Sequence, residues 1–226
     1  MYGSGGAGGV LEGLVRAVVI RESIGPGWPF LFAGRAGLFA HMTLRTSRLT
    51  LIPVTLAMVD AALAGNDALA ATLGVTVPAT WPHEFLDADA FSWFRARLTE
   101  PGYAEGWWMY FATHEGVDGP ALIGSVGYKG PPDADATVEI GYGVVSDQRR
   151  RGYAAEMAMA LTARAFAESD VRRVIAETMP ELVGSIGVLE RCRFVLVDGA
   201  AEPGAIRFEL TRERFMSAGT TGAAQA

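Results

Sequence analysis

Residues 138–156 read Val138-Glu-Ile-Gly-Tyr-Gly-Val-Val-Ser-Asp-Gln-Arg-Arg-Arg-Gly-Tyr-Ala-Ala-Glu156, an apolar strand that passes through a basic, glycine-containing turn into a helix. Such a turn directs several backbone N–H groups and the positive end of the helix dipole at one point. Small residues in the turn and the first helical turn leave the backbone open to an anion. The order of strand, turn and helix therefore predicts a cradle for a diphosphate.

The phosphate contacts are expected from the turn and from the first turn of the helix. Side chains of the arginines can add charge-assisted hydrogen bonds, although three consecutive residues cannot all face one anion. A cluster of charges is by itself more typical of a solvated turn, and the placement between strand and helix favours phosphate binding. The candidate residues are Arg149, Arg150, Arg151, Gly152, Tyr153, Ala154 and Ala155.

This stretch resembles the acetyl-CoA-binding motif of the GNAT acetyltransferase superfamily. Residues 173–194, Arg173-Val-Ile-Ala-Glu-Thr-Met-Pro-Glu-Leu-Val-Gly-Ser-Ile-Gly-Val-Leu-Glu-Arg-Cys-Arg-Phe194, extend the resemblance to the RimJ/RimL-like branch. That branch usually shows Pro-Glu-Asn, a serine three residues after the Asn, Val-Leu-Glu and a closing Gly-Phe. The matching residues are Pro180, Glu181, Ser185, Val188, Leu189, Glu190 and Phe194. Leu182 replaces the Asn, Gly187 a common Arg, and Arg193 the Gly.

The resemblance implies an α/β fold whose mixed, mainly antiparallel central sheet is flanked by helices. It also implies transfer of an acetyl group from acetyl-CoA to an amine by direct attack in a ternary complex, without a covalent acetyl-enzyme. In relatives, the end of the motif strand opens from its neighbour, and its backbone pairs with the pantetheine arm. By position that task falls to Val144 and Val145.

Two residues are candidates for proton transfer. Strand alternation places Glu139 on the layer opposite Val138 and Ile140, where it could act as general base. The alternative is a glutamate that is exposed or paired with an arginine. The resemblance makes Ser185 the proton donor to the leaving thiolate, because Leu189 occupies the position of the tyrosine that many relatives use. A serine near a helix start can equally be an N-cap.

The acceptor is less well defined by the sequence. The weak candidates for substrate contact are Trp81, His83, Glu84 and Trp108. The alternative for the first three is an ordinary loop with Trp81 anchored in the core. The formal charge of −6 and the pI near 5.1 favour a cationic acceptor, such as a protein N-terminus, a polyamine-like metabolite or an aminoglycoside-like amine. They argue against nucleic-acid and anionic-membrane partners.

A second function from another class also agrees with the sequence. The changes at Leu182, Gly187 and Arg193 favour a GNAT-like module that binds CoA as a sensor or interaction partner without transferring an acetyl group. The single Cys192 excludes an internal disulfide, and three scattered histidines offer no metal spacing, so no metal is expected. Together with the lack of a long apolar run, these features favour a cytoplasmic protein. The sequence is compatible with a homodimer.

Composition and patterning predict one acetyltransferase domain at 42–215, a frayed tail at 216–226 and a glycine-rich extension at 1–41. The extension is interpreted as flexible or as the product of an upstream start or of cloning; the alternative is a docking or dimerisation arm. Strands are expected at 44–51, 107–113, 121–128, 137–145, 173–178, 194–197 and 206–210. Helices are expected at 55–73 with a break near 66–67, then at 88–98 after an N-cap at Asp87, and at 152–166 and 183–193.

Overall fold

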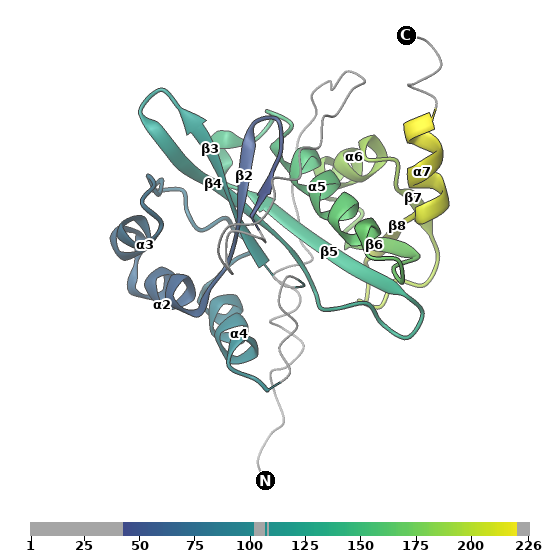
Figure 1. Cartoon of the computed structure of the whole chain (residues 1–226), viewed down its shortest axis with the longest axis horizontal. Coiled ribbons are helices and arrows are strands. Elements are labelled where there is room, and N and C mark those ends of the chain that lie inside the picture. Colours follow the sequence, from purple (N-terminus) through teal and green to yellow (C-terminus); the bar gives the residue numbers. More distant parts are fainter. Residues whose placement is uncertain (1–42, 102–106, 108, 221–226) are drawn as a thin grey trace.

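A computed structural model describes residues 43–101, 107 and 109–220, and shows an eight-stranded sheet in the order β1-β2-β3-β4-β5-β6-β8-β7 (Figure 1). Among the strand pairs of the described residues, only β5–β6 is parallel, so the predicted mixed, mainly antiparallel sheet flanked by helices is confirmed. The strands are β1 (Leu44–Arg45), β2 (Leu49–Pro53), β3 (Met109–Gly116), β4 (Gly119–Tyr128), β5 (Thr137–Val144), β6 (Arg173–Thr178), β7 (Val195–Val197) and β8 (Ile206–Thr211). The helices are α2 (Leu56–Ala64), α3 (Asn66–Leu73), α4 (Ala88–Leu98), α5 (Tyr153–Ala167), α6 (Val183–Arg191) and α7 (Arg212–Thr220).

The first predicted strand, 44–51, is in fact two strands. β1 and β2 form an antiparallel hairpin whose turn is Thr46-Ser47-Arg48. The helical segment that follows is broken at Gly65, which has a φ of +124° that favours glycine, and not at 66–67. Asp87 is the N-cap of α4 as predicted, because its side chain accepts a hydrogen bond from the Ala90 N–H.

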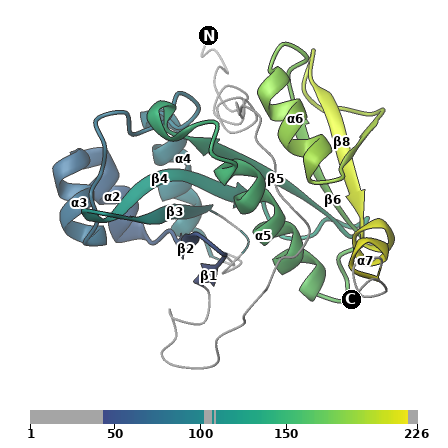
Figure 2. The same cartoon turned by 90° about the horizontal axis from the view of Figure 1, so that it is seen from above.

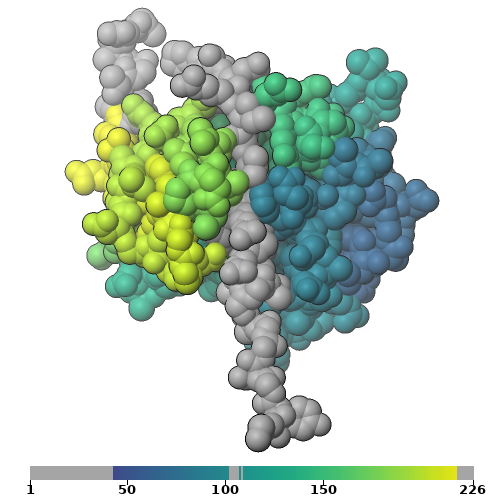
Figure 3. Space-filling model, turned by 180° about the vertical axis from the view of Figure 1, so that it is seen from behind, coloured from purple at the N-terminus to yellow at the C-terminus, as the bar shows by residue number. Residues whose placement is uncertain are grey.

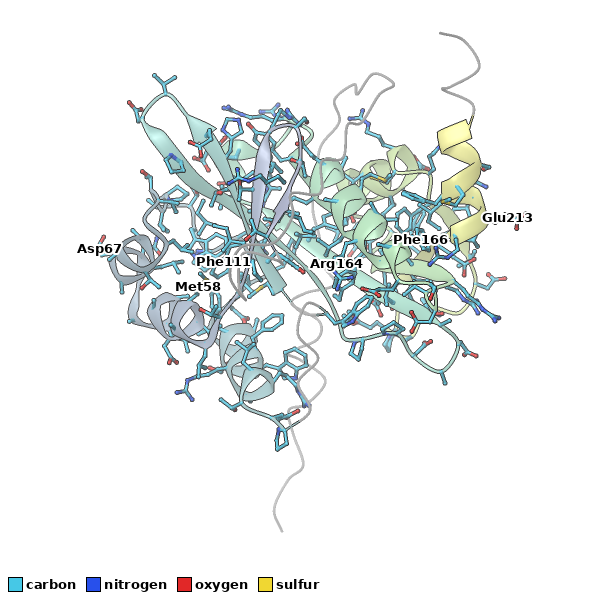
Figure 4. The ribbon with its side chains drawn as sticks, viewed as in Figure 1. Met58, Asp67, Phe111, Arg164, Phe166 and Glu213 are labelled. Carbon is cyan, nitrogen blue, oxygen red and sulfur yellow. The ribbon has the colours of Figure 1, made fainter. Side chains whose placement is uncertain are left out.

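The sheet separates two cores. Figure 2 shows α5 on one face and α2, α3 and α4 on the other. In β5 the residues that alternate toward α5, Val138, Ile140 and Tyr142, belong to the larger core. The smaller core contains Phe111 from β3 and the partly buried Met58 from α2, which lie beside each other in Figure 4. Residues 139, 141 and 143 of β5 therefore face the side of α2–α4.

Strands β5 and β6 diverge after a short paired segment. Their register covers three pairs, from Thr137↔Arg173 to Glu139↔Ile175, whereas the rest of β5 pairs only with β4. Two backbone hydrogen bonds show which residues of β5 point their backbone groups toward β4. The Val145 N–H donates to the Ile123 carbonyl, and the Glu139 carbonyl accepts from the Lys129 N–H. Alternate residues of an antiparallel strand point their backbone groups to opposite edges. The backbone groups of Tyr142 and Val144 consequently face the opening between the two strands.

The C-terminal elements complete the sheet and correct two predicted boundaries. β6 has the expected bounds, but α6 ends at Arg191 and not at residue 193. α7 crosses the boundary expected at 215, so the tail is helical as far as Thr220. The 1–41 extension and residues 221–226 lie outside the described residues. Figure 3 shows the C-terminal elements and the α2–α4 group on opposite sides of the molecule. Within the described ranges, no helix is long and apolar enough to cross a membrane.

Candidate functional site

The turn between β5 and α5 leaves backbone donors free at the start of the helix. The turn holds Arg150 and Gly152 in the left-handed region, with φ of +63° and +79°. The first bond of the helix ladder joins the Glu156 N–H to the Gly152 carbonyl at 3.1 Å. The N–H groups of Tyr153, Ala154 and Ala155 therefore have no carbonyl partner within α5. Together with the positive end of the helix dipole, they are donors of the kind that can hold an anion.

Two of the three turn arginines are available to this site. Arg150 and Arg151 are exposed, and neither guanidinium pairs with an acidic side chain in the part of the chain that the structure describes. Arg149 has other partners: its Nε donates to the Val144 carbonyl at 3.0 Å, and its Nη2 forms an ion pair with Glu84. Arg149 thus holds the turn in shape. Its guanidinium contacts the Val144 carbonyl and Glu84, which differs from the predicted role of phosphate ligand.

Glu156, which sequence reasoning did not single out, ties the turn to the first hairpin. Its carboxylate is 1% exposed, and Oε1 accepts from Ser47 Oγ at 3.0 Å and from the Arg48 N–H at 2.9 Å. Arg48 also donates Nε to Glu156 Oε2 at 2.7 Å and Nη1 to the Arg151 carbonyl at 2.9 Å. A charged residue among the alanines of an otherwise apolar helix face was the available signal. This buried carboxylate fixes the start of α5 in place.

The edge of β5 corrects one predicted backbone contact. Val144 lies on the edge that opens toward β6, as the prediction for the pantetheine arm requires. Val145 does not, because its N–H donates to Ile123 at 3.0 Å and its carbonyl accepts from the Gln148 N–H at 3.0 Å. Both polar groups of Val145 are therefore used inside the protein, and Tyr142 takes its place on the open edge.

Glu139 lies at the point where β5 and β6 part. Its side chain is 18% exposed, and Oε1 forms an ion pair of 2.6 Å with Lys129 Nζ. The predicted orientation toward the side opposite Val138 and Ile140 agrees with the structure, and the charged partner is a lysine and not an arginine. Burial raises the pKa of Glu139, and the charge of Lys129 offsets only part of that rise. A carboxylate with a raised pKa is a stronger base at neutral pH.

Ser185 lies inside α6 and not at its cap. The N-cap is Leu182, Ser185 is the third helical residue, and its side chain is 1% exposed. The alternative role as an N-cap is therefore excluded. Ser185 faces Tyr142, which sequence reasoning did not single out. Burial raises the pKa of Tyr142, and the nearby Ser185 side chain acts in the opposite direction, although the Tyr142 hydroxyl makes no hydrogen bond to any described residue. Two hydroxyl groups thus meet on the α6 side of the opening.

The predicted acceptor residues divide into different roles. Trp81 is 4% exposed and packs edge-on against Phe111 with ring centroids 5.3 Å apart, so it belongs to the core. His83 Nε2 lies 2.8 Å from Ser125 Oγ, and its ring covers the Cα of Gly143. Burial and the nearby charge of Arg149 lower the pKa of His83 to about 3, so this histidine is neutral at pH 7. Trp108 lies outside the described residues.

The three departures from the family pattern have visible structural consequences. Leu182 caps α6 without any side-chain hydrogen bond. A Cβ at Gly187 would meet nothing within 4 Å, so this position has room for a larger residue. Arg193 adopts a φ of +67°, a conformation that glycine accepts at lower cost. A metal site is a separate question. Among the described residues, no group of three or more His, Cys, Asp or Glu side chains could hold a metal ion.

Comparisons with known proteins agree with this geometry. The family described as "Acetyltransferase (GNAT) domain" matches residues 48–195. A Bacillus subtilis (strain 168) protein, "Uncharacterized N-acetyltransferase YjdG", is 29% identical over 160 residues, which cover 70% of this chain and 93% of the relative.

Two solved structures share the fold at low identity. The ribosomal L7/L12 α-N-protein acetyltransferase RimL, in complex with coenzyme A, has a TM-score of 0.54 at 16% identity and covers 75% of this chain and 97% of its own. The microcin C7 self-immunity acetyltransferase MccE, in complex with acetyl-CoA and AMP, has a TM-score of 0.52 at 14% identity, with coverage of 74% and 93%. The family match spans the cradle and both diverging strands, and the chain therefore belongs to the GNAT family of acetyltransferases.

Proposed function

We propose that this acetyltransferase transfers an acetyl group from acetyl-CoA to a primary amine, either a protein N-terminus or a small molecule, by direct attack in a ternary complex. The observation that carries the proposal is the opening of β5 from β6 beside the N-terminus of α5. It offers an anion site next to a backbone edge of β5 that is not paired with β6. The net charge of −6 supports a cationic acceptor. A cytoplasmic location and a homodimer stay predictions.

The free donors suit a diphosphate carried on an amide-containing arm. The N–H groups of residues 153–155, with Arg150 and Arg151, would hold the pyrophosphate, because they supply both hydrogen bonds and positive charge. The backbone groups of Tyr142 and Val144 would pair with the amides of the pantetheine arm as a neighbouring strand does. Acetyl-CoA supplies the thioester on which the amine acts.

The proton transfers are assigned to residues on the two sides of the opening. Glu139 would take a proton from the acceptor ammonium, directly or through water, so that the amine nitrogen can bond to the thioester carbonyl carbon. As the C–S bond breaks, the thiolate takes a proton, and Ser185 is the candidate donor. Tyr142 lies near Ser185 on the same side of the opening. Cys192 is buried with a raised pKa of about 12, and so is unsuited to a covalent acetyl-enzyme.

One observation favours a second function, a module that binds CoA without transfer. The Asn of the RimJ/RimL-like pattern is Leu182 here, which leaves α6 without a side-chain cap beside Ser185. A less ordered start of α6 would misplace the proton donor while leaving the anion site of α5 intact. The two functions therefore differ in turnover and not in CoA affinity.

The test is calorimetric titration with acetyl-CoA, followed by a screen of primary amines for release of CoA thiol. Gly152→Glu would place a carboxylate at the cap of α5, where it repels phosphates. We expect binding by the natural protein and its loss in this variant. No binding by the natural protein would refute both functions. Binding without release of thiol for any amine would favour the second.

Two control variants separate charge from backbone strain. Gly152→Gln adds similar bulk and the same strained φ without the charge, so the difference between the two variants measures repulsion alone. Gly74→Glu adds a carboxylate at another left-handed glycine, the C-cap of α3, where a Cβ meets nothing within 4 Å. It should lose stability but keep its affinity for acetyl-CoA.

A further inference from the structure

Lys129 is the only lysine in the chain, in which every other cationic side chain of the Lys and Arg class is an arginine. It follows β4 directly, and its backbone N–H donates to the Glu139 carbonyl at 2.9 Å. The two residues therefore face each other across the ladder, and directly opposed side chains emerge on the same face of a sheet. The one lysine stands beside the candidate general base.

The Lys129 ammonium lies between two carboxylates. Nζ is 2.6 Å from Glu139 Oε1 and 3.4 Å from Glu202 Oε1, and the three side chains are only 16–22% exposed. An ammonium is a compact charge with three donors that rotate freely, whereas the planar guanidinium of arginine suits one bidentate partner. A lysine can therefore bridge two separate carboxylates at this position. The pair uses Oε1 of Glu139, so Oε2 is the oxygen that can receive a proton from an acceptor.

Glu202 is held in place by a second, buried carboxylate. It lies in the loop between β7 and β8, and the side chain of Glu177 on β6 fixes this loop. Glu177 accepts from the Ala201 N–H at 2.9 Å and the Glu202 N–H at 3.3 Å, and from Arg207 Nε at 2.8 Å. The contacts form one chain from β8 through the loop to Lys129 and Glu139.

We propose that Lys129 is a positioning residue of the acetyl transfer, which keeps the Glu139 carboxylate ionised and directed to the acceptor side, and that Glu202 places Lys129. The proposal rests on the proposed role of Glu139 as base. It adds the β7–β8 loop to the active site and explains why a lysine stands at this one position.

The physical reason is the balance of charges around Glu139. Partial burial favours the neutral carboxyl, and an adjacent cation favours the carboxylate. The charged groups that face Glu139 are Lys129 after β4, Glu177 on β6, Arg207 on β8 and, beyond Lys129, Glu202. Without Lys129, burial and Glu177 would act against Arg207 alone. Glu139 would then hold its proton to higher pH, so that a smaller fraction of the protein at neutral pH would carry the ionised carboxylate that accepts a proton from the amine.

The experiment is a carboxyl-¹³C NMR titration of Glu139, whose signal is assigned by its loss in Glu139→Gln. Removing an opposite charge at this distance should raise the pKa of Glu139 by about 1–3 pH units in Lys129→Met. Lys129→Arg keeps the charge and should restore part of the difference. An unchanged Glu139 titration in Lys129→Met would overturn the proposal, even if that variant lost thermal stability, because Lys129 would then not be the group that keeps Glu139 ionised.

A kinetic arm links the titration to the reaction. With the amine that the screen finds best, the acidic limb of kcat/KM against pH should move in Lys129→Met by the same number of units as the NMR titration, with acetyl-CoA affinity retained. A fall in rate without movement of the limb would contradict the proposal. If the natural protein bound no acetyl-CoA, the proposed function would fail, whereas the NMR arm would still decide whether Lys129 controls Glu139.

Discussion

The backbone at Arg193 provides the prediction whose magnitude is best defined. Arg193 follows the C-cap of α6, and its φ of +67° is the conformation that usually selects glycine there. Its N–H donates to the Glu190 carbonyl, and the Phe194 N–H donates to that of Leu189, so the turn closes the helix. Arg193→Gly keeps these bonds and removes the clash between Cβ and the carbonyl oxygen. We expect a more stable protein.

The size follows from two opposed effects. A residue with a Cβ costs about 1–2 kcal/mol in the left-handed region. Removing this cost stabilises the protein, but about 0.4–1 kcal/mol of the gain is lost again, because glycine makes the unfolded chain more flexible. The Arg193 side chain is exposed and takes part in no ion pair within the described ranges, so its loss removes little else. The central values of the two ranges leave a net gain of about 0.8 kcal/mol, or about 2–3 °C in Tm for a domain of this size.

The assay is urea unfolding of the two proteins at one pH, with the slope m compared so that a change of midpoint reports stability. Arg191→Gly is the matched control, because the last residue of α6 has a regular helical backbone and should lose about 1 kcal/mol on change to glycine. An Arg193→Gly protein that is no more stable than the natural one would show that the left-handed backbone costs nothing here. The argument from φ would then be wrong.

Three further predictions use the same unfolding assay. Gly187→Ala should stabilise α6 by about 0.5–1 kcal/mol, since the Cβ enters open space in a helix interior; no gain would contradict this. His83 has a pKa near 3 when folded and about 6.5 when unfolded, so acid favours the unfolded state. Stability relative to His83→Gln should fall by up to about 1.4 kcal/mol per pH unit below pH 6.5, whereas parallel curves would refute the shift. Glu156→Gln should cost about 1–3 kcal/mol through its lost charged hydrogen bonds to Arg48 and Ser47, with Glu190→Gln as an exposed control.

Local signals predicted much of the fold. The N-cap at Asp87 and the bounds of β6 each depend on residues that are close together in the sequence, and the structure agrees with both predictions. The β1–β2 hairpin could not be found in this way. Its turn, Thr46-Ser47-Arg48, contains neither glycine nor proline and is held by Glu156, more than a hundred residues away. The contacts that hold this turn are tertiary, so the local sequence does not reveal it.

The same distinction applies to the site. The order of strand, turn and helix was predictable because the three adjoin in sequence, and the orientation of Glu139 because strand alternation is local. Val145 was assigned wrongly, since its backbone direction depends on the register of β5 against β4, which a single strand does not reveal. Lys129 acquires its partners, and Tyr142 its neighbour Ser185, only when β4, α6 and the β7–β8 loop meet around β5.

The loop before α4 contacts the turn that precedes α5. Thr80 Oγ1 donates to Asp147 Oδ1 at 2.6 Å, and Glu84 pairs with Arg149, whose Nε holds the Val144 carbonyl. A carbonyl oxygen has two lone pairs, so Val144 can keep Arg149 and still accept a second hydrogen bond at the open edge. Arg149 is thus compatible with an occupied edge. Its contacts hold the turn in shape before any ligand arrives, so that the donors of α5 and the edge of β5 are ordered together.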